Sequence, residues 1–154
     1  MLPDGSVLTE SAAILLHLGL AHPRSGLLPA DPAARAQVLR GLVYIAANCY
    51  AAISIHDYPE RWTTATTRPA QDKVRQGARA RLHANWAIFA DTFPAQPFLG
   101  GNTAGALDIL AAVVTKWSGT RAYLRKHRPA FFKTLHRIEQ DPVVAAVFAE
   151  HWKD

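Results

Sequence analysis

Apolar residues recur at helical spacing through most of the sequence after residue 10. The longest pattern predicts a helix from about residue 32 to residue 55, with a buried stripe formed by Val38, Leu42, Ile45, Cys49 and Ile53. Intervals of three and four residues place these side chains on one face of an α-helix, where they can pack against a neighbour. The periodicity therefore predicts a mostly α-helical bundle.

Turn-forming residues divide the chain before this helix. The stretch from His22 to Pro32 contains three prolines and one glycine, a composition typical of a connecting segment. We therefore expect a linker at residues 23–32, between an N-terminal segment at 1–22 and an all-helical domain at 33–154.

The N-terminal segment predicts a small strand-turn-strand-helix unit. A Pro-Asp-Gly turn occupies residues 3–5, a β-favouring pair follows at residues 7–8, and an apolar helix begins near Ser11. Ser11 is a favoured helix cap, and Gly19 is a favoured helix end. A hairpin with two or three residues on each side is too short to be stable alone.

A second apolar helix is predicted from about Ala106 to Trp117, and its apolar residues on all sides indicate that it is the central, buried one. Asp108 occupies the third position of this helix if Gly105 is its cap. At that position a carboxylate can accept hydrogen bonds from free backbone N–H groups at the helix start. We therefore expect Gly105 and Asp108 to form a structural cap.

Composition limits the possible functions of the chain. The 154 residues carry one cysteine and a formal net charge of +5, and no histidine pair has metal-ligand spacing with a carboxylate between the two. The basic residues lack the aromatic interleaving of a nucleic-acid surface, and no run of residues approaches the length of a membrane span. We therefore expect no nucleic-acid, membrane or metal partner. The lone Cys49 fits a packing role in a reducing compartment, and we expect a cytoplasmic protein.

The long helix at residues 32–55 has a second face, which carries Tyr44 and Asn48. These side chains could border a cleft for a hydrophobic ligand. An ordinary hydrogen bond to a neighbouring helix explains them about as well, and the sequence leaves both alternatives open.

Several motifs, taken in order, resemble one family. The stretch DGSVLTESAAILLHL resembles the end of the thioredoxin-like domain of cytosolic glutathione transferases. The linker motif LLP-x-DP, the helix end YPERW, the FLGG turn and the Ala-Leu-Asp start of the buried helix resemble the helical domain of that family. The resemblance covers essentially the whole chain. It implies a C-terminal-type helical bundle preceded by a remnant hairpin and helix of a thioredoxin-like α/β domain.

The resemblance also implies roles for individual residues. Glu10 would bind the ammonium group of the γ-glutamyl end of glutathione, and Ser11 would bind its carboxylate. Tyr44, Asn48 and Trp117 would border the hydrophobic substrate. Without the family motif, Ser11 is a helix cap and Glu10 a first-turn acid. At the position of Gly105 the family usually has Ser or Thr.

The catalytic Ser, Tyr or Cys of the family lies before the segment that this chain matches, and we expect the reading frame to continue upstream of Met1. Two functions remain open. The first is a homodimeric glutathione transferase, which uses glutathione as co-substrate to attack a hydrophobic electrophile and is inactive as these 154 residues alone. The second is a non-catalytic helical binding or assembly module.

Overall fold

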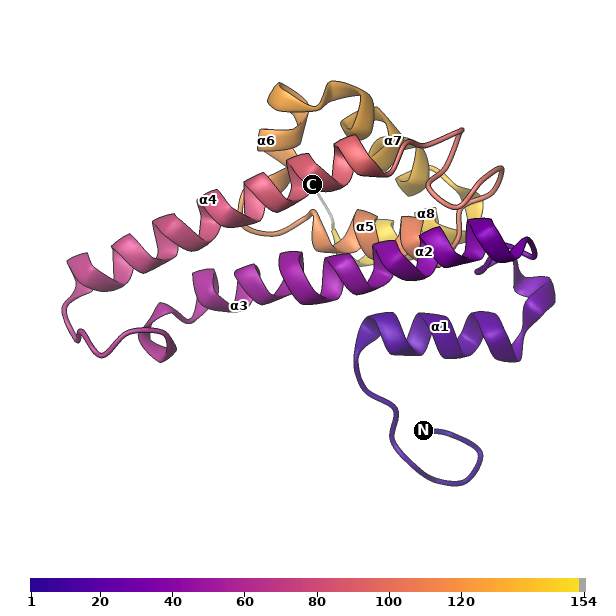
Figure 1. Ribbon diagram of the computed structural model, residues 1–154, viewed down its shortest axis with the longest axis horizontal. Coiled ribbons are helices and arrows are strands. Elements are labelled where there is room, and N and C mark those ends of the chain that lie inside the picture. Colours follow the sequence, from indigo (N-terminus) through magenta and orange to yellow (C-terminus); the bar gives the residue numbers. More distant parts are fainter. Residues whose placement is uncertain (153–154) are drawn as a thin grey trace.

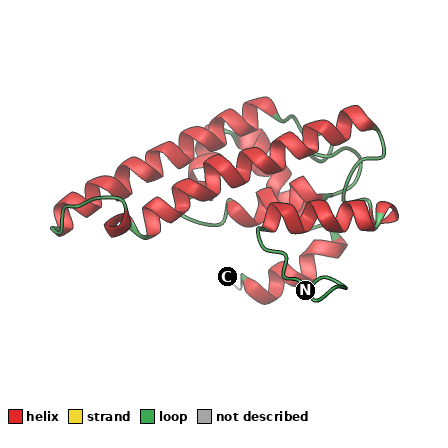
Figure 2. Cartoon of the chain, turned by 60° about the horizontal axis from the view of Figure 1, so that its bottom comes forward, coloured by secondary structure: helices red, strands yellow, loops and turns green. Residues whose placement is uncertain are grey.

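The computed structural model describes residues 1–152, which are helices joined by loops with no β-strand among them (Figures 1 and 2). This architecture confirms the predicted α-helical bundle. The α-helices of the described residues are α1 (Ser11–Ala21), α2 (Pro32–Tyr44), α3 (Ala51–Asp57), α4 (Arg68–Thr92), α5 (Ala106–Val114), α6 (Thr120–His127), α7 (Pro129–Glu139) and α8 (Pro142–His151).

Two long helical segments run side by side along the molecule (Figure 1). One is α4, and the other consists of α2 and α3 joined without a break. Helix α5 lies against α1, α2 and α7, and is therefore the central helix of the bundle. Helix α1 packs on the side of α2 and α5 away from α4.

A π-helical turn at Ile45–Tyr50 joins α2 to α3. The helix starts at Pro32, where the side chain of Asp31 accepts a hydrogen bond from the N–H of Ala34 at 2.7 Å. Among residues 1–152, this continuous helix is the one that is long and apolar enough to cross a membrane. Its predicted stripe is buried in the protein core, and 39% of its most apolar window is buried in the structure.

The core lies where α2, α4, α5 and α7 meet. Helix α5 has buried residues on most of its sides, as its sequence predicts. The largest fully buried side chains include Trp86, Phe89 and Leu82 from α4, Leu42 from α2, Leu107 from α5, and Leu135 and Ile138 from α7.

The carboxylate of Asp108 connects α5 to the loop before it. Oδ1 accepts a hydrogen bond from the N–H of Leu99 at 2.8 Å. Oδ2 accepts hydrogen bonds from Gly105 at 3.1 Å and from Gly100 at 3.3 Å. Burial raises the pKa of Asp108 above its usual range, although the three N–H donors act in the opposite direction. Asp108 therefore closes the start of α5 and holds the Leu99–Gly100 turn against it.

Gly105 allows the linker to approach the start of α5. The N–H of Ala106 donates to the carbonyl oxygen of Leu27 at 2.9 Å. A Cβ atom added at Gly105 would lie 2.9 Å from that same oxygen, which is too close for an ordinary contact. The chain therefore needs glycine at this position, where a serine or threonine side chain would displace the linker backbone.

Two features of the N-terminal segment differ from the expectation. Helix α1 continues to Ala21, and Gly19 lies within it, where a Cβ would come 2.5 Å from Cγ of Leu28. Gly19 therefore serves close packing and does not end the helix. Near the start, the N–H of Leu2 donates to the carbonyl of Ser6 at 2.8 Å, which closes a turn without a flanking β-ladder. The residues that flank this turn are too few to form the interstrand hydrogen bonds of a stable β-hairpin.

We predict that Gly105→Ser destabilises the protein, although serine is a good helix cap. Overpacking at this contact should lower the free energy of unfolding by about 1–3 kcal/mol. The matched control is Gly77→Ser, because Gly77 is exposed within α4 and a Cβ there has no neighbour within 4 Å. That change should raise stability by about 0.5 kcal/mol or less, since serine favours helix over glycine. Chemical denaturation measures both, and a Gly105→Ser protein as stable as the original would contradict the packing argument.

Candidate functional site

The start of α1 carries two polar side chains in an unusual backbone setting. Glu10 has φ 66° and ψ 109°, in the left-handed half of conformational space that side chains rarely adopt. Glu10 occupies the cap position and Ser11 is the first helical residue, so Ser11 is not the cap that the sequence suggests. Backbone strain of this kind gathers at binding and catalytic sites, where surrounding structure maintains it.

Neither polar side chain at this helix start is used within the protein. Among the described residues, the Glu10 carboxylate and the Ser11 hydroxyl have no hydrogen-bond or ion-pair partner. The first backbone N–H groups of α1 are likewise without intrahelical acceptors, as at any helix start. The segment therefore offers one anionic group beside a set of free donors.

A hollow of about 350 Å³ lies between this helix start and the π-helical turn. Glu10, Ser11 and Ala12 line one side of it. The other lining residues come from the π-helical turn and α5: Ile45, Ala46, Tyr50 and Leu110. The site thus combines a polar edge that can bind a charged, amino-acid-like group with an apolar wall.

The π-helical turn directs two neighbouring side chains to opposite sides. Cys49 is fully buried, and burial raises the pKa of its thiol to about 12. A thiol in this state is not a nucleophile at neutral pH, so Cys49 packs in the core as its position in the stripe suggests. Tyr50 is 47% exposed and faces the hollow. Wide turns of this type occur often at functional sites.

Tyr44 and Asn48 lie on the face of the long helix that is turned toward α4. The hydroxyl of Tyr44 donates to the carbonyl oxygen of Asn85 at 3.1 Å. The side-chain amide of Asn85 donates to the carbonyl oxygen of Asn48 at 2.9 Å, and that of Asn48 donates to the carbonyl of Tyr44 at 3.1 Å. This geometry is the interhelical hydrogen bonding that the sequence leaves open, and neither residue lines the Glu10 hollow.

Trp117 follows α5 and borders a second hollow of about 310 Å³, near the end of α3. Tyr50 lines both hollows, and its ring meets the ring of Trp117 edge-on at 6.0 Å. The structure therefore brings Trp117 next to the Glu10 site through Tyr50. Sequence reasoning missed Tyr50, because the π-helical turn that ends at this residue changes the direction of its side chain from that expected for a regular α-helix.

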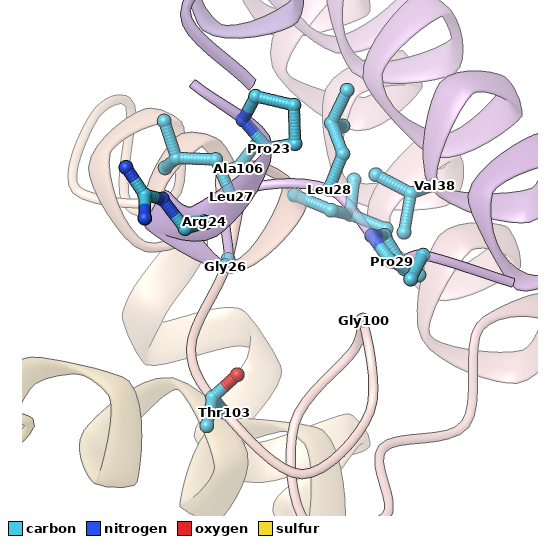
Figure 3. Close-up of a pocket in the computed structure, with 13 residues that line it drawn as sticks. Pro23, Arg24, Gly26, Leu27, Leu28, Pro29, Val38, Gly100, Thr103 and Ala106 are labelled. Atoms are coloured by element: carbon cyan, nitrogen blue, oxygen red, sulfur yellow. The ribbon is translucent and has the colours of Figure 1, made fainter. Parts of the chain in front are cut away.

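A third hollow of about 290 Å³ separates the linker from the loop before α5 (Figure 3). Linker residues such as Leu28 and Pro29 line one side, and Gly100 and Thr103 line the other. Arg24 and Thr103 contribute its only polar side chains. It has no carboxylate, thiol or imidazole, so it is a weaker candidate than the hollow at Glu10.

Metal binding finds no support in the part of the chain that is described. Within residues 1–152, no three His, Cys, Asp or Glu side chains converge as metal ligands. His56 and Asp57 form a close pair of such side chains, with Nδ1 of His56 2.9 Å from Oδ1 of Asp57. The candidate site is therefore the hollow at Glu10 and Ser11.

The fold is similar to those of several bacterial proteins of known structure. A glutathione transferase homolog from Sulfitobacter with bound glutathione is 22% identical, with a TM-score of 0.81, and the match covers 97% of this chain and 71% of that one. A sphingomonad glutathione S-transferase complexed with glutathione is 25% identical, with a TM-score of 0.74 and coverage of 99% and 72%. A glutathione transferase from Methylococcus capsulatus is 25% identical, with a TM-score of 0.73 and coverage of 97% and 70%.

No protein-family model matches the sequence, and no curated protein matches it either. The similarity of this chain to known proteins is therefore found in its fold. The matches extend over nearly the whole of this chain and over about seven tenths of each structure, 71% and 72% for the first two. Together, these structural matches support a relationship of this chain to the glutathione transferase family.

Proposed function

We propose that the hollow at Glu10 and Ser11 binds the γ-glutamyl end of glutathione. The observation that carries this proposal is the pair of unused polar side chains at a strained helix start. Glutathione presents an α-ammonium and an α-carboxylate side by side at that end. The occurrence of glutathione in structurally similar proteins supports the same ligand class.

Each group at the site has a distinct part in this binding. The carboxylate of Glu10 pairs with the ammonium of the ligand. The hydroxyl and backbone N–H of Ser11 donate to the ligand carboxylate, which is also favoured by the positive end of the α1 dipole. Because these contacts lie at the end of glutathione remote from sulfur, they anchor the peptide and take no part in bond making.

The proposed reaction is conjugation to a hydrophobic electrophile. The glutathione thiolate attacks an electrophilic carbon, and the leaving group departs with the bonding electron pair. We place the electrophile beside Tyr50 and Trp117, which border the apolar side of the site. Tyr44 and Asn48 act in this proposal by fixing the long helix to α4, through the Tyr44 hydroxyl and the Asn48 carbonyl oxygen.

Conjugation also needs a donor that lowers the pKa of the glutathione thiol. The buried Cys49 and the hydrogen-bonded Tyr44 are unsuited to this role. We therefore infer that the 154-residue chain conjugates little glutathione. We also infer that residues 1–22 bind glutathione, residues 23–32 form a linker, and residues 33–154 bind the electrophile. The alternative is a non-catalytic helical binding module. Rapid conjugation of glutathione to a chlorinated aromatic substrate would exclude this alternative.

Substitution at the helix start tests the binding proposal. Glu10→Gln and Ser11→Ala should each weaken glutathione binding about tenfold or more, because a hydrogen bond to a charged group is worth about 1.5–3 kcal/mol. Glu60→Gln is the matched control, since Glu60 is an exposed carboxylate outside this hollow. Isothermal titration calorimetry gives the three affinities, and an unchanged affinity in both site variants would refute the assigned roles.

We also infer a cytoplasmic homodimer. A single buried thiol suits a reducing compartment. Exposed apolar side chains on α1 and α2 support association, among them Ile14, Leu18, Leu39 and Val43. Sedimentation velocity at tens of micromolar should give the mass of a dimer, and a monomer at that concentration would contradict the inference.

A further inference from the structure

Three aromatic side chains converge on the hollow at the end of α3. Tyr50 comes from the π-helical turn, Tyr58 follows α3, and Trp117 follows α5. Their exposed fractions are 47%, 47% and 36%, so a large apolar area faces solvent at one place. The remaining lining residues are Ile53, Ser54 and Asp57. We name these six residues the aromatic hollow.

One ring of the aromatic hollow already contacts a cation within the protein. The guanidinium of Arg61 lies over the ring of Tyr58, 4.3 Å from its centre. Tyr50 and Trp117 meet edge to face at an interplanar angle of 86°, so they do not cover each other by stacking. Ring faces carry negative charge density and attract cations, most strongly in tryptophan.

Asp57 places a carboxylate in the same hollow. Its Oδ1 accepts a hydrogen bond from Nδ1–H of His56 at 2.9 Å. Within residues 1–152, Oδ2 has no hydrogen-bond or ion-pair partner. The oriented carboxylate thus retains one free oxygen at the hollow that the three rings line.

The nearby serine does not complete a hydrolytic triad. Oγ of Ser118 lies 3.5 Å from Nδ1 of His56, which is the same nitrogen that bonds to Asp57. A relay needs the carboxylate and the serine on different ring nitrogens. The cluster therefore orients groups and does not create a nucleophile.

The turn that carries Trp117 is fixed in position. Ser118 and Gly119 have φ values of 55° and 74°, and the N–H of Thr120 donates to the carbonyl oxygen of Trp117 at 3.1 Å. The ring of His83, from α4, lies with Nε2 3.4 Å from the carbonyl oxygen of Ser118. A preformed hollow loses little conformational freedom when a ligand binds.

We propose that the aromatic hollow binds an organic ammonium cation with apolar substituents, such as a quaternary or alkylated amine. The ring faces contact the apolar substituents and attract the charge, and the Asp57 carboxylate pairs with it. The proposal rests on the proposed function in one respect, because Tyr50 and Trp117 also border the electrophile position. The proposal therefore specifies that the electrophile bound beside Tyr50 and Trp117 carries an amine.

An unreactive ligand pair tests the proposal on the full chain without glutathione. Benzyltrimethylammonium is compared with neopentylbenzene, its neutral isostere, by tryptophan fluorescence and calorimetry. Cation–π attraction corresponds to a preference of about twofold to thirtyfold, and we expect at least fivefold tighter binding of the cation. Asp57→Asn should reduce this preference, and Trp117→Leu should weaken binding of both ligands.

The matched control is Asp91→Asn, which removes an exposed carboxylate paired with Arg128 outside the hollow. It should leave the preference unchanged, and circular dichroism confirms that each variant is folded. Equal binding of the two ligands, a preference unaffected by Asp57→Asn, or no saturable binding would each overturn the proposal.

Separate titration with glutathione distinguishes failure of the two proposals. Cation binding in a protein that does not bind glutathione would support the ammonium site and remove its link to conjugation. Glutathione binding in a protein that does not bind the cation would overturn the ammonium site alone.

Discussion

The buried carboxylate of Asp108 is the interaction on which the arrangement of the site depends. Its three backbone hydrogen bonds fix the start of α5 and the turn before it. A hydrogen bond from the N–H of Ala106 to the carbonyl oxygen of Leu27 fixes the linker to the same helix start. The linker then places α1 against α5, so that Glu10 and Ser11 face the π-helical turn. A cap of one helix thereby positions side chains that lie almost one hundred residues earlier in the chain.

Polar groups in this structure divide into those that hold the fold and those left free. Tyr44, Asn48 and Asn85 satisfy one another across two helices, as buried polar groups generally do. Glu10 and Ser11 have no side-chain partner among the described residues, although the backbone of Glu10 is strained. Strain without an internal contact to explain it indicates a functional requirement for the conformation. This contrast identifies the start of α1 as the candidate functional site.

The periodic stripe predicts the long helix at residues 32–55, and Gly105 with Asp108 predicts the start of α5. Asp31-Pro32 and Asp141-Pro142 begin α2 and α8, and both aspartates accept hydrogen bonds from the first turn. Helix α6 was not predicted, because its eight residues show too few periodic positions. The role of Gly19 depends on Leu28 in another segment, and the direction of Tyr50 depends on a π-helical turn. Neither feature can be recognised from the neighbouring residues in the sequence.

The most direct test of the account is an NMR titration of the amide signals with glutathione. The account predicts saturable shifts at Ser11 and Ala12, accompanied by shifts at Ala46 and Tyr50 across the hollow. Cysteinylglycine, which lacks the γ-glutamyl group, should produce no saturable shift at Ser11 or Ala12. Equal responses to the two peptides, or shifts confined to other parts of the chain, would contradict the assignment of this helix start as the glutathione site.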